Sequence, residues 1–220
     1  MKKSFTVILS KTTTVIFDFD GVIGDTFSHN RDIACLLYEE FRHEKPRQKM
    51  IEKLIGKGVR TVIKELNVPL TKIPYFEKRF RQELALRIDK VKIFKGMKAV
   101  LKQIKKAGYP LGILSSNSQK NLHYIFQKNQ IDFFDFIYSD SSFFGKGKVL
   151  RKLLKKLHLK PAQIIYIGDE ERDIQASQQN KVKIITVGWG YDNERVLKKQ
   201  KPDFFAKEPK DLLKILKKLC

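Results

Sequence analysis

The sequence predicts an α/β protein with a three-layer α/β/α core, a parallel sheet, and a small helical cap inserted after the first core strand. Two observations predict this fold. Short apolar runs alternate with longer amphipathic segments over most of the 220 residues, as expected for parallel strands covered by helices on both faces. By contrast, residues 25 to 92 hold no convincing strand and show helical patterns throughout.

Six apolar runs mark the predicted strands, at 14–19, 110–115, 134–139, 163–169, 183–189 and, more weakly, 203–206. Amphipathic helices are expected between most of them. One such segment, GMKAVLKQIKKAG, ends at Gly108, and glycine is common at helix C-termini. The run at residues 5–9 fits either an additional strand or a leader, and the pattern favours neither.

The helical segments between the first two core strands are separated by Pro46, Pro69 and Pro74. We therefore expect residues 24–92 to form a cap, and residues 1–23 and 93–220 to form the core. A cap inserted there would lie over the carboxyl ends of the strands, where ligands bind in parallel sheets.

The formal net charge of +21 raises the alternative of nucleic-acid binding. However, the excess is spread along the chain, with +6 in residues 24–92 and +15 in the other 151 positions. Its two densest stretches, 146–160 and the C-terminal KDLLKILKKL, have leucines at helical spacing and therefore predict amphipathic helices with a solvated basic face. The overall field would also attract an anionic substrate.

Membrane and secretory classes are not favoured by the sequence. No apolar run approaches the roughly 20 residues that span a bilayer, and the run at 5–9 is too short for a signal peptide. Cys35 and Cys220 are not expected to form a disulfide, and the four histidines show no metal-binding spacing. We expect a cytoplasmic protein.

Two aspartates end the first predicted strand, in VIFDFDGVIGDT (15–26). Asp18 and Asp20 are two residues apart and therefore point to the same side of the strand, while Gly21 permits a tight turn and close ligand approach. Two neighbouring carboxylates repel each other and stay ionised together only beside a cation. Taken alone, the pair fits a solvated turn as well as it fits a site.

A second acidic cluster follows the run at 163–169, in IIYIGDEERD (164–173). Asp169 ends that strand, and Asp173 lies one helical turn further on the same face. Glu170 and Glu171 are expected to point outward. Four aspartates from two strand ends form an oxygen-rich site that suits Mg²⁺.

Four motifs occur in the order DFDGV, ILSSNS (113–118), KGKVL (146–150) and GDEERD (168–173). In type and order they resemble the motifs of the haloacid dehalogenase superfamily, and most closely its phosphoglycolate-phosphatase-like members with a helical cap. That resemblance covers essentially the whole chain and implies a Rossmann-like core. It also implies a Mg²⁺-dependent phosphatase of a small phosphorylated metabolite, working through an aspartyl-phosphate.

The resemblance also implies roles for individual residues. Asp18 would be the nucleophile and Asp20 the proton carrier, with Asp18, Asp20, Asp169 and Asp173 at the metal. Ser115 and Lys146 would bind the phosphoryl group, although Ser116 and Lys148 fit the motifs too. Ser116, Asn117, Gly21 and, from the cap turn GKG (56–58), Lys57 would contact substrate or phosphate; that turn is equally consistent with a plain helix–helix connection.

Two other functions are consistent with the sequence. A sugar-phosphate mutase would keep both Asp18 and Asp20, and only its turnover would separate it from a phosphatase. A basic nucleic-acid-binding protein, or a 3′-phosphatase acting on nucleic acid, would account for the net charge. The sequence does not indicate the oligomeric state.

Overall fold

The computed structural model describes residues 13–49, 51, 63, 68–140 and 145–219. Its central sheet has six strands, all parallel, in the order β5-β4-β1-β6-β7-β8. The strands are β1 (Thr14–Phe17), β4 (Leu111–Ser115), β5 (Phe136–Ser139), β6 (Ile164–Gly168), β7 (Lys183–Val187) and β8 (Phe204–Ala206). The six predicted strands are therefore confirmed, while the run at 5–9 lies outside the described residues.

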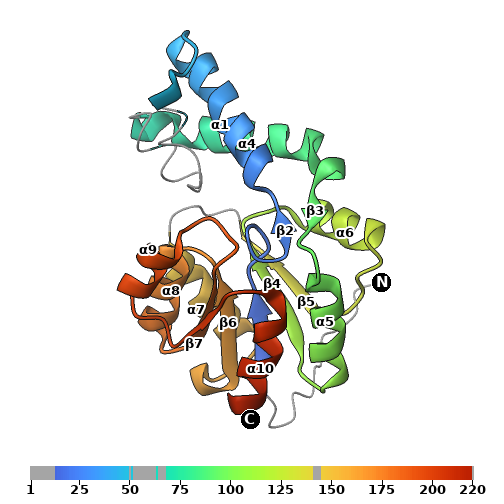
Figure 1. Ribbon diagram of the computed structural model, residues 1–220. Coiled ribbons are helices and arrows are strands. Elements are labelled where there is room, and N and C mark those ends of the chain that lie inside the picture. Colours follow the sequence, from blue (N-terminus) through green and yellow to red (C-terminus); the bar gives the residue numbers. More distant parts are fainter. Residues whose placement is uncertain (1–12, 50, 52–62, 64–67, 141–144, 220) are drawn as a thin grey trace.

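Helices cover both faces of this sheet (Figure 1), in agreement with the burial of every residue in the central strands β1, β4 and β6. On one face, α5 (Met97–Lys106), α6 (Gln119–Lys128) and α10 (Pro209–Leu219) pack on Val15 and Phe17 of β1. On the other, α7 (Lys146–Lys156), α8 (Glu171–Asn180) and α9 (Glu194–Lys199) pack on the layer that contains Ile16 and Tyr166. The three-layer α/β/α architecture is confirmed.

The segment after β1 leaves the core and forms a separate helical layer above it (Figure 1). Helices α1 (Phe27–Arg42) and α4 (Ile73–Leu86) pack on each other and bury their own apolar cluster, which includes Ile33, Leu37, Phe76 and Phe80. The short strands β2 (Gly24–Asp25) and β3 (Lys92–Ile93) pair antiparallel where the chain departs and returns. The domain limits at residues 24 and 92 stay a prediction.

Short 3₁₀ turns complete the described elements, at Leu70–Lys72, Ile88–Lys90 and Pro161–Gln163. Among the helices that the structure describes, none is long and apolar enough to cross a membrane.

Candidate active site

The order of the strands gathers the motif residues at one edge of the sheet. Strand β1 lies between β4 and β6, so its carboxyl end is flanked by theirs. Asp18 directly follows β1, Ser115 ends β4, and Asp169 directly follows β6. Lys146 is the first residue of α7 and reaches the same edge. This is the crevice at which open α/β sheets bind ligands.

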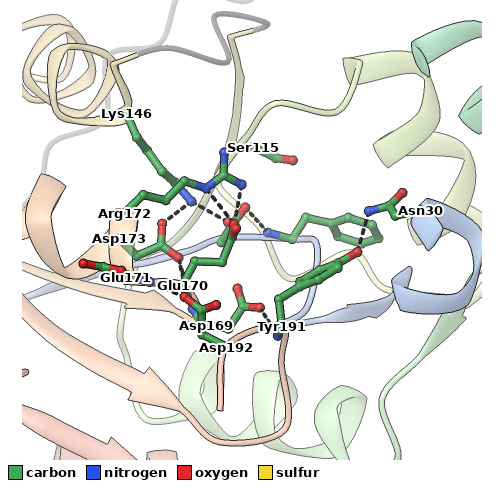
Figure 2. Close-up of polar contacts among 12 residues, drawn as sticks. Asn30, Ser115, Lys146, Asp169, Glu170, Glu171, Arg172, Asp173, Tyr191 and Asp192 are labelled. Atoms are coloured by element: carbon green, nitrogen blue, oxygen red, sulfur yellow. Dashed lines mark hydrogen bonds and ion pairs between the residues drawn. The ribbon is translucent and has the colours of Figure 1, made fainter. Parts of the chain in front are cut away.

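Lys146 joins the two acidic motifs (Figure 2). Its Nζ lies 2.5 Å from Asp18 Oδ2 and forms a second ion pair with Asp173 Oδ1. Burial alone would lower the pKa of Lys146, but the charges of Asp173 and Asp18 outweigh it and hold that pKa well above its ordinary value. Lys146 is therefore a charged ammonium beside Asp18 with 13% of its side chain exposed, whereas Lys148 is exposed.

The backbone at the start of α8 holds Asp173 in place. Its Oδ2 accepts hydrogen bonds from the backbone N–H groups of Asp169 and Glu170, both at 3.1 Å. Asp173 is the third residue of α8, and its bond to the backbone of the N-cap residue Glu170 is that of a capping box. Because one oxygen binds the backbone and the other pairs with Lys146, Asp173 is fixed as a support for the lysine.

Asp169 is fully buried and only half satisfied. Its Oδ2 accepts the Tyr191 N–H at 2.7 Å, whereas its Oδ1 has no hydrogen-bond partner among the described residues. Burial, reinforced by the charge of Glu170, raises the pKa of Asp169 well above its ordinary value. A buried carboxylate oxygen without a donor is costly unless a cation or ligand occupies its place.

Four carboxylates form a compact buried cluster that fits a divalent cation. Asp18, Asp169, Glu170 and Asp173 each place one oxygen within 4.8 Å of the others. The expectation that Glu170 points outward is wrong: Glu170 is buried and its Oε2 accepts a hydrogen bond from Arg172 Nε at 2.6 Å. An all-oxygen donor set with an unpartnered Asp169 oxygen suits a hard cation such as Mg²⁺.

Asp20 lies beside this cluster and is only partly buried. Burial, followed by the charge of Asp18, raises its pKa to about 6. Thr26 donates to the Asp20 carboxylate, and the Thr26 hydroxyl is 2.8 Å from Tyr191 Oη. Asn30 of α1 also donates to Tyr191 Oη (Figure 2). A series of hydrogen bonds thus connects Asp20, through Thr26 and Tyr191, to Asn30 of the first cap helix.

A small pocket of about 20 Å³ opens directly at Asp18. Ser115, Ser116, Lys146 and Arg172 line it. Ser115 is buried, and its Oγ accepts the Asn117 N–H at 3.0 Å, which leaves its hydroxyl hydrogen free to donate. The structure therefore brings both candidate serines to the pocket, together with Lys146 and the Asp18 carboxylate.

A larger cavity of about 90 Å³ lies between the core and cap helix α4. Ser116 and Arg172 line both spaces, so the larger cavity continues from the smaller pocket. Asp20 and Asn117 line it from the core, and Arg81 lines it from α4. A ligand bound at Asp18 would extend into this cavity.

The sequence did not indicate several residues of the site. Glu170, Arg172, Tyr191, Asn30 and Arg81 all line or support it. The glycine-rich stretch after β7 could have pointed to Tyr191. A Cβ at the neighbouring Gly190 would lie 2.3 Å from Asp169, so this stretch passes close to the acidic cluster. Gly21 lies against Asp169 and Tyr191. The GKG turn with Lys57 lies outside the described residues.

Comparison with known proteins gives a consistent result. Residues 15–187 match the family model described as haloacid dehalogenase-like hydrolase. The phosphoglycolate phosphatase of Synechococcus elongatus is 26% identical over 206 residues, covering 93% of this chain and 97% of that protein. The pyrophosphatase PpaX of Bacillus mycoides is 25% identical over 217 residues, covering 95% and 99%.

The fold also matches solved structures. A crystal structure of a predicted phosphatase from Clostridium acetobutylicum superposes with a TM-score of 0.83 at 22% sequence identity, covering 94% of this chain and 100% of that one. The motif order, the site geometry and the family match agree, and the chain belongs to the haloacid dehalogenase-like hydrolase family.

Proposed function

We propose that the protein is a phosphatase that hydrolyses a small phosphomonoester by transferring the phosphoryl group first to Asp18 and then to water. Membership of the hydrolase family, with one relative named as a phosphatase and another as a pyrophosphatase, supports the reaction class. The observation that carries the residue assignment is the Lys146 bridge between Asp18 and Asp173, in the wall of a pocket that Ser115 and Ser116 also line.

In the first step, a carboxylate oxygen of Asp18 attacks phosphorus and the bond to the leaving oxygen breaks. Lys146 offsets the negative charge that phosphate brings to a carboxylate, and it is already positioned before substrate arrives. Ser115 donates its hydroxyl hydrogen to a phosphoryl oxygen, with Ser116 and the Asn117 amide alongside. These groups bind and orient the phosphoryl group.

Asp20 is the proposed proton carrier. It lines the cavity that would hold the leaving group, and it lies close enough to Asp18 to feel that charge. It donates its proton to the leaving oxygen in the first step. In the second step it takes a proton from the water that attacks the aspartyl-phosphate, which restores Asp18 and releases inorganic phosphate.

A divalent cation, which we propose to be Mg²⁺, would supply further positive charge to the phosphoryl oxygens. Asp18, Asp169 and the backbone carbonyl of Asp20 would hold it, and the unpartnered Asp169 Oδ1 supports this choice. Asp173 would stand behind these ligands, since both of its oxygens already hold Lys146 and the α8 backbone. Glu170 joins the cluster but is paired with Arg172.

The nucleophile assignment is tested by Asp18→Asn. The change keeps size and shape but removes the attacking charge, so we expect Mg²⁺-dependent hydrolysis of p-nitrophenyl phosphate to disappear while the thermal unfolding transition remains. Asp132→Asn is the control, because Asp132 is exposed and carries the same change of charge. Turnover at the wild-type rate in Asp18→Asn would refute the assignment.

The mutase alternative is less consistent with the cavity. A sugar phosphate must be held in two orientations, whereas the cavity measures only about 90 Å³. Release of inorganic phosphate, against formation of an isomeric sugar phosphate, separates the two activities. We further propose a cytoplasmic protein that acts on a soluble metabolite; salt-dependent DNA or RNA binding that survives Asp18→Asn would favour the nucleic-acid alternative instead.

A further inference from the structure

The cavity under helix α4 contains polar atoms that the protein itself does not satisfy. Arg81 Nη1, Asn117 Nδ2, Asn30 Oδ1 and Asp20 Oδ1 are all buried and lack a hydrogen-bond partner among the described residues. All four residues line this same cavity. Buried donors and acceptors are normally paired, and unpaired ones at a cavity mark the place of a ligand or water.

Arg81 is the unpaired cation of this set. None of the described carboxylates forms an ion pair with it, although Glu77, one turn earlier in α4, feels its charge. The other charged groups that line the cavity are accounted for, since Arg172 forms an ion pair with Glu170 and Asp20 is the proposed proton carrier. A buried guanidinium nitrogen without an acceptor calls for an anion.

The neighbouring arginine of the same helix shows the contrast. Arg79 donates to Glu40 at 3.0 Å and to Glu83 at 3.1 Å, on the side of α4 that packs within the cap. Its role is accounted for by the fold. Arg81, two residues later, points to the other side, where the facing surface is the core site. Among the residues that the structure describes, Arg81 Nη1 therefore has no acceptor, and a bound molecule can provide one.

We propose that Arg81 binds a second anionic group of the substrate, carried by the leaving group as a carboxylate or a further phosphate. This inference rests on the proposed function, which places the scissile phosphate at Asp18 and the leaving oxygen at Asp20. The rest of the substrate then occupies the cavity as far as α4. At about 90 Å³, against roughly 300–1,000 Å³ for pockets that take drug-sized ligands, the cavity fits a leaving group of a few heavy atoms.

The test compares three short substrates with the full-length protein and Mg²⁺: 2-phosphoglycolate, which carries a carboxylate; inorganic pyrophosphate, which carries a second phosphate; and propyl phosphate, which carries neither. We expect Arg81→Met to lower kcat/KM for one or both anionic substrates by about 10- to 100-fold relative to propyl phosphate, the worth of a charge-assisted hydrogen bond. The substrate that loses most identifies the anion.

Two further variants separate recognition from general charge. Lys78→Met removes the same charge from an exposed position of α4 and should leave all three ratios unchanged. Arg81→Lys keeps the charge and should recover part of the loss, which also guards against a folding defect in Arg81→Met. If the wild type turns over all three substrates and Arg81→Met lowers them equally, or lowers none, the inference is wrong.

Binding provides a readout that does not depend on turnover. Calorimetry should show phosphonoacetate, a non-hydrolysable phosphonate with a carboxylate, binding about 10- to 100-fold more weakly to Arg81→Met, with propylphosphonate changed less. If the wild type hydrolyses no phosphomonoester, the proposed function fails, and this comparison still decides the role of Arg81. Equal affinity of phosphonoacetate for both proteins would overturn it.

Discussion

Replacing Gly21 by alanine should disable the site through Asp169. Gly21 has φ +76°, and a Cβ there would lie 2.0 Å from Asp169 Oδ2 and 2.6 Å from the Tyr191 ring. The left-handed backbone costs alanine about 1 kcal/mol. Asp169 must also leave its bond to the Tyr191 N–H, and a buried group left unsatisfied costs about 1–3 kcal/mol.

The expected loss of unfolding free energy is therefore about 2–4 kcal/mol, which lowers Tm by about 5–15 °C in a chain of this size. Hydrolysis of p-nitrophenyl phosphate should fall by at least about 10- to 100-fold at temperatures where the variant is folded, because a proposed metal ligand is displaced. Calorimetry and Mg²⁺-dependent turnover measure the two effects.

Gly108→Ala is the matched control. Gly108 has φ +90°, but a Cβ there meets no atom within 4 Å among the described residues. It should carry only the backbone cost of about 1 kcal/mol, or about 2–4 °C in Tm, with full activity. If Gly21→Ala loses no more unfolding free energy than Gly108→Ala and hydrolyses p-nitrophenyl phosphate at the wild-type rate, the close approach of Gly21 to Asp169 is not needed for stability or activity.

Two other predictions concern the charges of the site. Mg²⁺ at about 100 times its Kd should raise the Tm of the wild type by about 5–10 °C. Asp169→Asn should lose most of that rise, whereas the control Asp132→Asn should keep it. An equal rise in Tm in the two variants would show that the cation binds elsewhere. In steady-state kinetics, Lys146→Ala should lower kcat by about 10²–10³-fold, whereas replacement of the exposed Lys148 by alanine should change kcat little. A larger loss of kcat in Lys148→Ala than in Lys146→Ala would show that Lys146 is not the lysine that acts in turnover.

Much of the core could be predicted because its signals are local. A buried parallel strand is a short apolar run, and six such runs gave six strands. The period of two predicted that Asp18 and Asp20 share a side; in the structure both follow the end of β1, and Asp18 lines the smaller pocket while Asp20 lines the larger cavity. The helical period placed Asp173 beside Asp169. The polar ends of β1, β4 and β6 then meet because parallel strands share an edge.

The residues that were missed depend on contacts between distant segments. Glu170 was expected to face solvent, but its pairing with Arg172 turns it into the acidic cluster. Tyr191 reaches Asp169 only because the loop after β7 folds back onto Gly21. Arg81 is one of several basic residues on α4, and helical periodicity does not tell which of them faces the core when the orientation of the cap is unknown.

The charges of the site bear on the order in which a divalent cation and the substrate bind. The described site holds five carboxyl groups, at Asp18, Asp20, Asp169, Glu170 and Asp173, against three cations, Lys146, Arg172 and, from the cap, Arg81. The chain as a whole carries +21 and therefore attracts anions at long range, but a phosphate dianion that reaches the pocket without a divalent cation meets net negative charge within a few ångströms. Because Lys146 is already shared between two carboxylates, it offsets only part of that repulsion. We therefore expect a divalent cation to enter the carboxylate cluster before or together with the substrate.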